Sequence, residues 1–248
     1  MKIPKSHPRR ESLNTRELIV NGVDKGVTSI HGLIAHGRSE AFDYLLGEKT
    51  NGFALNSIEA ASALLLSAKN PVISVNGNAA ALVPRELGIL SKLLNAPLEV
   101  NIFHPSKERA LKIRDHLLSH GAIQVLLPEK GCKIKHLNSS RKYVNKNGIY
   151  KADVVFVPLE DGDRTEALIK NGKKVITVDL NPLSRTARNA TITIVDNLVR
   201  AIPLMISGMS RLRRLSQDEI NGIIMGYSNK NALTESMSVI GKNLIGPC

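Results

Sequence analysis

The chain has 248 residues, two cysteines and a formal net charge of +12 at neutral pH. This length suffices for one large α/β domain with helical extensions, and two cysteines are too few for a disulfide framework, so we expect a reducing, cytoplasmic setting. The apolar stretches are too short to span a membrane and the first ten residues lack the apolar core of a signal peptide, so no membrane partner is expected.

Apolar residues recur at roughly helical spacing in three segments near the N-terminus. They predict helices over residues 12–25, 32–46 and 57–68. Asn56 or Ser57 would cap the third of these helices, because both side chains accept hydrogen bonds from free backbone N–H groups.

Strands and helices alternate from about residue 70 onward. Continuous apolar, β-branched runs are typical of parallel strands that are buried on both faces. We therefore predict an α/β fold with a mainly parallel sheet, flanking helices and right-handed crossovers. The predicted strands cover residues 71–75, 97–102, 122–126, 153–157, 174–178 and 191–195. The predicted helices start at Pro84 and otherwise cover 106–120, 163–171, 197–212, 216–226 and 232–243.

Residues 129–150 are polar, rich in lysine and without a clear period, so we interpret them as a loop or a mobile excursion. The whole chain is then one α/β domain. It would consist of an N-terminal helical region over about 1–69, a sheet region over about 70–196 and a C-terminal helical region over about 197–248.

Short polar clusters follow five of the predicted strands. In open parallel sheets, ligands bind just beyond the carboxyl ends of the strands. Asn, Asp and Gly at these ends therefore predict a site for a nucleotide or a similarly polar small molecule. The clusters are 76–78, Asn101, 160–164, 179–181 and 196–197.

The common motifs of nucleotide and metal sites are missing from the chain. It contains no G-x-x-x-x-G-K-[ST] loop, no G-x-G-x-x-G after a strand, no H-E-x-x-H, no paired C-x-x-C and no G-x-S-x-G. An enzyme with this sequence must hold its nucleotide or substrate with less common loops.

The positive charge lacks the features of nucleic-acid recognition. Basic residues are scattered, and tryptophan is absent. Stacking on single strands needs aromatic side chains, and no known nucleic-acid-binding motif is present. The same field would attract small anionic substrates, so we expect these as partners and no nucleic acid.

Two basic segments are candidates for phosphate binding. The first is residues 6–10, which lead into Arg16, and the second is residues 32–44, which contain His36 and Arg38 beside a glycine. Arginine can form paired hydrogen bonds to phosphate oxygens, and histidine can act as an acid, a base or a hydrogen-bond donor. The alternatives are a solvated terminal helix for the first segment and a helix with internal ion pairs for the second.

Two acidic segments follow strands. Glu160, Asp161 and Asp163 can bind Mg²⁺, orient an amine or act as a base, or Asp163 can simply cap the next helix. Asp179 follows a later strand, where an acidic group often binds ribose hydroxyls, and Arg185 comes six residues later, where it could meet a phosphate.

Taken in order, these segments resemble the archaeal phosphopantothenate synthetase family, also called 4-phosphopantoate–β-alanine ligase. Each matching string is short, but the set spans about residues 3–200 in the same order. The strings are Ile3–Arg9, Gly32–Arg38, Glu40–Leu45, Val72–Asn78, Ala152–Val155, Val157–Leu168, Asp179–Arg185 and Ile192–Asn197.

The resemblance implies a Rossmann-like homodimer of coenzyme A biosynthesis. Such an enzyme joins 4-phosphopantoate to β-alanine, forming 4′-phosphopantothenate while ATP is split to AMP and pyrophosphate with Mg²⁺ present. By resemblance, the residues expected to contact ATP are Arg16, Arg38, Asp179, Leu180, Asn181, Arg185, Thr186, Asn197 and Leu198.

The chemistry leaves several roles open. A carboxylate needs activation before it forms an amide, and ATP can supply this as an acyl-adenylate. Glu160, Asp161 or Asp163 could hold the ammonium of β-alanine and accept its proton, with His36 as the other candidate base. The candidates for substrate binding are Asn76, Asn78 and Arg164, and no metal ligand is assigned.

Two other classes of function remain open. One is another nucleotide-dependent enzyme on the same sheet, such as a kinase or a nucleotidyl transferase. The other is a non-catalytic binder of nucleotides or nucleic acid, which only the charge favours. Formation of AMP rather than ADP distinguishes the ligase from a kinase.

Overall fold

Six parallel strands form the centre of the protein in a computed structural model, which describes residues 3–7, 9–103, 106–159 and 161–246. Their order across the sheet is β3-β2-β1-β6-β7-β8, and every neighbouring pair runs parallel. The predicted parallel α/β sheet is therefore confirmed. The strands are β1 Pro71–Val75, β2 Leu98–Val100, β3 Val125–Leu126, β6 Val154–Pro158, β7 Lys174–Val178 and β8 Ile192–Ile194.

The strand order reverses between β1 and β6. The chain runs outward from β1 through β2 to β3, then returns to the other side of β1 and runs outward again from β6 to β8. This is the order of a Rossmann-like sheet, in which the carboxyl ends of the two central strands diverge and leave a crevice. Asn76 follows β1 and donates its Nδ2 hydrogen to the carbonyl of Leu159, which follows β6, at 2.6 Å. The two strand ends are thus tied together beside the crevice.

Side chains alternate between two buried faces along each central strand. Val154 and Phe156 of β6 join the larger core with α3, α5 and α9, whereas Val155 and Val157 join a smaller core on the opposite face. This explains the continuous apolar runs in the sequence, because both faces are covered. The helices against the larger core are α3 Gly52–Ser67, α5 Pro84–Leu94, α6 Lys107–Ser119 and α9 Leu198–Leu212.

The predicted cap of α3 was wrong. The helix begins five residues earlier than expected, with Asn51 at its N-cap, because Phe53 and Ala54 extend its apolar face and are buried. The start of α5 at Pro84 is as predicted, since proline suits the first turn of a helix.

The smaller core is covered by the segment that was predicted to be a loop or a mobile excursion. Residues 129–150 form the hairpin of β4 Glu129–Lys133 and β5 Tyr143–Val144, with short helical turns η1 Ser140–Lys142 and η2 Lys146–Tyr150. Ile134, Val144 and Ile149 are between 0 and 3% exposed and pack under the sheet. The prediction was wrong because three irregularly spaced apolar side chains anchor an otherwise polar stretch.

Two short helices complete this face, α7 Gly162–Lys170 and α8 Arg185–Asn189. The alternative interpretation, in which Asp163 caps α7, was wrong. Asp161 occupies the N-cap without a capping hydrogen bond from its side chain, and Asp163 lies in the first turn, where its carboxylate accepts from Arg185.

A buried carboxylate, Glu99 of β2, lies beneath the smaller core. Its oxygens accept hydrogen bonds from the backbone N–H groups of Asn145 at 2.9 Å and Ile149 at 2.7 Å. Burial raises the pKa of Glu99 to about 7, against the opposing effects of those two bonds and of the Arg164 charge. The native protein therefore keeps a proton on Glu99 at a pH where the unfolded chain has lost it.

This proton makes stability depend on pH. Because the native pKa is about 7 against 4.5 in the unfolded chain, the native state binds more protons between these values. We expect the free energy of unfolding to fall by up to roughly 3 kcal/mol as pH rises from 4.5 through 7. Urea denaturation from pH 5 to 8 should show this fall in the wild type and a flatter profile in Glu99→Gln. Parallel profiles for the two proteins would mean that native Glu99 is ionised throughout.

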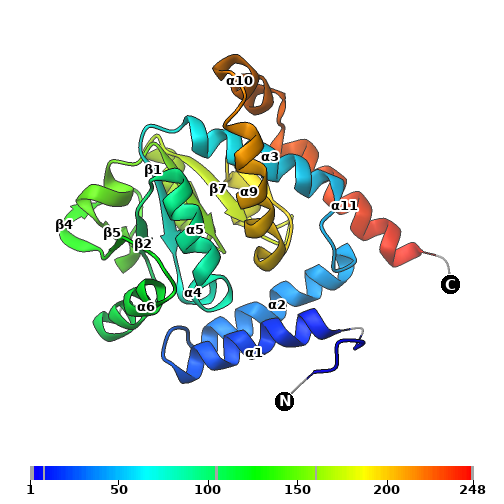
Figure 1. The fold of residues 1–248 in the computed structure, drawn as a ribbon, viewed down its shortest axis with the longest axis horizontal. Coiled ribbons are helices and arrows are strands. Elements are labelled where there is room, and N and C mark those ends of the chain that lie inside the picture. The colour runs from blue at the N-terminus through cyan, green and yellow to red at the C-terminus, as the bar shows by residue number, and fades with distance from the viewer. Residues whose placement is uncertain (1–2, 8, 104–105, 160, 247–248) are drawn as a thin grey trace.

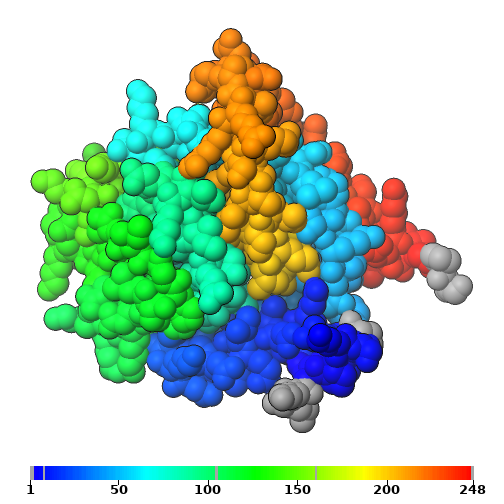
Figure 2. All heavy atoms as spheres, in the orientation of Figure 1, coloured from blue at the N-terminus to red at the C-terminus, as the bar shows by residue number. Residues whose placement is uncertain are grey.

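Two helices, α1 Arg10–Asp24 and α2 Ile30–Leu46, form a hairpin that lies as a separate layer across one end of the molecule (Figures 1 and 2, blue). Both pack on the short helix α4 Gly77–Leu82. Gly77 is required there, because a Cβ at this position would come within 2.6 Å of the Val27 carbonyl oxygen. The hairpin is therefore seated directly over the end of β1.

Two further helices close the chain, α10 Gln217–Gly226 and α11 Asn229–Ile245. α11 packs on α2 and α3, and Asn243 donates to the carbonyl of Leu45 at 2.8 Å. Among the described residues, no helix has the length and apolar character needed to cross a membrane.

Candidate active site

A cavity of about 640 Å³ lies between the carboxyl ends of the strands and the α1–α2 hairpin. Its floor comes from residues that follow β1, β2, β6, β7 and β8, so it occupies the crevice where the strand order reverses. The charged residues of its lining include more cations than carboxylates. The cations are Lys5, Arg9, Arg10, Arg38, Arg109, Arg141 and Arg200, and the carboxylates are Glu11, Glu40, Asp43, Glu48 and Asp161.

Arg38 of α2 is an exposed residue on the cavity wall. Its side chain makes no hydrogen bond or ion pair with any residue that the structure describes, although its charge acts on the carboxylate of Asp179. Arg38 is therefore able to bind a ligand anion without breaking a contact of the fold.

Arg16 of α1 is differently placed. Its Nε and Nη2 hydrogen-bond the carboxylate of Glu40 at 2.7–3.0 Å, and Ser12 donates to the same carboxylate. Burial alone would raise the pKa of Glu40, but the bonds from Arg16 and Ser12 hold that pKa below its usual value. Arg16 does not itself line the cavity, and its guanidinium is already paired with Glu40. A nucleotide that reached Arg16 would therefore meet an existing ion pair.

His36 lies one helical turn before Glu40 and is 8% exposed. Its Nε2 atom is buried and has no hydrogen-bond partner among the described residues. Burial lowers the pKa of His36, and the nearby charges of Glu40 and Asp43 oppose this shift while Arg16 adds to it. The imidazole is thus neutral at pH 7, with a ring nitrogen left for a ligand or a proton.

Asn76 and Asn78 line the cavity, and both also hold the fold together. Asn76 caps α4 by accepting from the N–H of Ala79 at 3.0 Å, and its Nδ2 donates across to Leu159. Asn78 donates to the carbonyl of Gly32 at 2.8 Å and accepts from Thr28. Each amide has at most one N–H hydrogen left for a substrate.

Arg141, which belongs to the segment of residues 129–150, lines the cavity. Its side chain is 5% exposed, and its Nε donates to Oδ1 of Asn101 at 2.7 Å. Its Nη1 donates to Oδ2 of Asp161 at 2.5 Å, while the Asp161 side chain is 52% exposed. The pair places a fixed cation and an accessible carboxylate on the same wall.

Three residues that the family resemblance predicts at ATP form another part of the site. Leu180 follows β7, Asn197 and Leu198 follow β8, and all three line the cavity. Asp179 lies just behind them, and burial raises its pKa against the hydrogen bonds from Ser184 and Asn181. Asn197 caps α9, where its side-chain oxygen accepts from the N–H of Val199 and its carbonyl accepts from the N–H of Arg200.

Besides Arg16 and Asp179, several further predicted residues do not line the cavity. Arg164 is 1% exposed beneath the sheet and donates to Ser74 at 3.1 Å. Arg185 is bound to Asp163 and Glu166 on the surface, Thr186 is 3% exposed at the start of α8, and Asn181 accepts from the N–H of Leu183 in its own loop. Glu160 lies outside the residues that the structure describes.

Sequence reasoning assigned no role in the site to three charged residues that the structure places at the cavity. These are Asp43, Arg141 and Arg200. Asp43 stood in the polar segment of residues 32–44, which could have singled it out. Arg141 and Arg200 stand in stretches where a lone arginine resembles a solvated surface charge.

Within the described ranges, no group of three or more His, Cys, Asp or Glu side chains has the arrangement of a metal site. A Mg²⁺ ion that arrives on nucleotide phosphates needs only one or two carboxylates from the protein. Asp161 fits this need, because its side chain is half exposed and lines the cavity.

Comparison with known proteins finds relatives over most of the chain. The model of the phosphopantothenate/pantothenate synthetase family matches residues 53–243. The chain is 53% identical to the 4-phosphopantoate–β-alanine ligase of Thermococcus kodakarensis over 94% of its own length and 90% of that protein. It is 49% identical to the ligase of the same name from Methanosarcina mazei, over 98% of this chain and 95% of that one. A third such ligase, from Methanospirillum hungatei, is 45% identical over 98% of both chains.

Proposed function

Because this chain belongs to the phosphopantothenate/pantothenate synthetase family, we propose that it is a ligase that joins 4-phosphopantoate to β-alanine with ATP as co-substrate. The observation that carries the proposal is the cation-rich cavity at the reversal of strand order. Both ATP and 4-phosphopantoate are polyanions, and a cavity of this charge attracts and screens them.

The site supports a reaction in two displacements. In the first, a carboxylate oxygen of 4-phosphopantoate attacks the α-phosphorus of ATP, and the bond to the β-phosphate breaks to release pyrophosphate. In the second, the amine of β-alanine attacks the acyl carbon of the adenylate, and AMP leaves with the bonding electrons while the nitrogen loses a proton. Arg38 would stabilise the negative charge that builds up on the phosphates, as a fixed donor does at an oxyanion.

His36 is the best base of the three candidates that the structure describes. Its neutral ring has a buried nitrogen without a partner among the described residues, whereas the carboxylate of Asp161 already accepts from Arg141 and that of Asp163 accepts from Arg185 outside the cavity lining. Asp161 is better suited to hold the ammonium of β-alanine before it reacts. A Mg²⁺ ion that arrives with the nucleotide would supply further neutralisation of charge beside Asp161.

The resemblance to the family also leads us to expect a cytoplasmic homodimer. Light scattering on the purified protein at micromolar concentration measures this mass directly. A monomer mass near 27.0 kDa would contradict the expected dimer.

The reaction is tested by an end-point assay in which each substrate is omitted in turn. We expect phosphopantothenate and AMP in equal amounts only when ATP, 4-phosphopantoate, β-alanine and Mg²⁺ are all present. Unphosphorylated pantoate should be a poor substrate, because it lacks the anion that the cavity cations would bind. ADP as the product, or equal activity with pantoate, would refute the proposed reaction.

A further inference from the structure

α2 crosses the cavity and is attached to the rest of the protein near both of its ends. Near its N-terminal end, Asn78 of α4 donates to the carbonyl of Gly32 at 2.8 Å. Near its C-terminal end, Asp43 is bound by Arg200 of α9. The side chains of α2 that face the cavity between these points include His36 and Arg38. Their placement against the sheet therefore depends in part on these two attachments, together with the packing of α2 on α1, α4 and α11.

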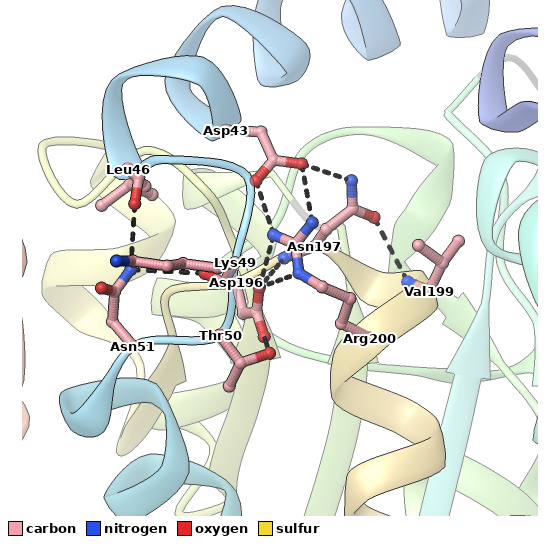
Figure 3. A network of polar contacts seen from close by, with 9 residues as sticks. All are labelled: Asp43, Leu46, Lys49, Thr50, Asn51, Asp196, Asn197, Val199 and Arg200. Carbon is pink, nitrogen blue, oxygen red and sulfur yellow. Dashed lines mark hydrogen bonds and ion pairs between the residues drawn. The ribbon is translucent and has the colours of Figure 1, made fainter. Parts of the chain in front are cut away.

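Arg200 bridges two carboxylates from distant parts of the chain (Figure 3). Its Nη2 and Nη1 donate to the two oxygens of Asp43 at 2.5 and 3.2 Å, and its Nε donates to Oδ1 of Asp196 at 2.8 Å. The side chains of Asp43, Asp196 and Arg200 are 7, 0 and 17% exposed. A single guanidinium thus lies between two buried carboxylates, which would repel each other without it.

The two carboxylates also accept hydrogen bonds from Thr50, whose Oγ1 donates to Oδ2 of Asp196 at 2.6 Å, and from Asn197. Asn197 donates its Nδ2 hydrogen to Oδ2 of Asp43 at 2.8 Å, and its backbone N–H donates to Asp196 at 2.7 Å. Asn197 is also the N-cap of α9. Asp43 of α2 therefore binds both Arg200 and the side-chain amide of Asn197 at the start of α9.

We propose that Arg200 is a positioning residue for the ligase reaction, which sets the spacing between α2 and the start of α9 and thereby places Arg38 against the bound nucleotide. The expected kinetic effect rests on the proposed function. The hydrogen bonds of Arg200 to Asp43 and Asp196 are independent of that function. Lysine cannot replace Arg200, because a point charge cannot bind both oxygens of Asp43 and one of Asp196 at once.

The test compares Arg200→Lys with Arg211→Lys. Arg211 lies on the same helix and forms an exposed ion pair with Glu59, away from the cavity, so it is a matched control. We expect Arg200→Lys to lower kcat/KM for ATP by about tenfold to a hundredfold, since small displacements of positioned groups cost rates of this size. Arg211→Lys should match the wild type. A variant Arg200→Lys that is less heat-stable but has normal kinetics at 25 °C would show a structural role alone and overturn the proposal.

A second comparison asks whether Arg200 acts through Arg38. In an Arg38→Ala background, Arg200→Lys should have a much smaller effect on kcat/KM than in the wild type, because the group that it positions is gone. Effects that simply multiply would overturn this part of the proposal. If Arg200→Lys does not fold, Asp43→Asn removes the same attachment from the α2 side with little change of shape.

Hydrogen exchange separates this proposal from the proposed reaction. Amides in the second half of α2 should exchange faster in Arg200→Lys than in Arg211→Lys, with the strand amides unchanged. Unchanged exchange in α2 would refute the positioning role even if the enzyme is active. An inactive wild type with faster exchange in Arg200→Lys would refute only the ligase reaction.

Discussion

Arg38→Ala is expected to lower kcat/KM for ATP by about two to three orders of magnitude, the usual cost of removing a donor that stabilises charge in the transition state. The guanidinium lines the cavity, is exposed, and makes no ion pair within the described part of the chain. Its loss should therefore leave the melting temperature nearly unchanged. Arg38→Lys should recover only part of the activity, because lysine lacks the planar pair of donors.

Steady-state kinetics with varied ATP, together with thermal unfolding, measure both effects. Arg85→Ala is the control, since Arg85 is an exposed arginine of α5 outside the cavity lining. Normal kinetics in Arg38→Ala would remove this residue from the site. A large fall in its melting temperature would instead show that Arg38 stabilises the fold.

His36→Gln is expected to lower kcat by about a hundredfold or more, as the loss of a general base does. Burial holds the pKa of His36 below its ordinary value of 6.5, with Glu40 and Asp43 opposing this and Arg16 adding to it. The neutral, active form therefore prevails at pH 7, and the rate of the wild type should fall only as pH drops below 6.5. That acidic decline should be absent in His36→Gln.

His116→Gln controls for the loss of a histidine as such. Burial also lowers the pKa of His116, which lies on α6 outside the cavity lining. Its pH profile should follow that of the wild type. A His36→Gln enzyme that keeps both its turnover and its acidic decline would exclude His36 as the base.

The sheet was predictable because its signal is local. The six parallel strands lie in short, largely apolar runs, five of which a polar cluster follows, and such runs identify buried strands by themselves. Three parts of the structure were missed for physical reasons, and one of them is α8, whose five residues are too few for a helical period. α4 has only six residues, too few for a helical period, and the hairpin of residues 129–150 depends on Ile134, Val144 and Ile149, whose spacing follows no period.

The site was predictable only where its residues lie in recognisable strings. His36, Arg38, Asn76, Asn78, Asp161, Leu180, Asn197 and Leu198 were predicted, and all of them line the cavity, while their roles stay predictions. The bridge from Asp43 through Arg200 joins residues 157 positions apart, and the bond from Arg141 to Asn101 spans 40. No local pattern marks such pairs, because the two partners of each pair lie in separate stretches of the sequence.

The reversal of strand order has a consequence for recombination between relatives. β1 to β3 all precede residue 127 and β6 to β8 all follow residue 153, so each half of the sheet is continuous in sequence. The α2 wall of the cavity belongs to the first half, and the Asn197 wall belongs to the second. A chimera joined between β5 and β6 would exchange one wall for that of a related ligase while each half kept its own strand pairs, apart from the contact between β1 and β6. Exchanging the coding sequences of two related ligases at this one point would therefore give hybrid proteins. In each hybrid, the α2 wall of the cavity comes from one parent and the Asn197 wall from the other.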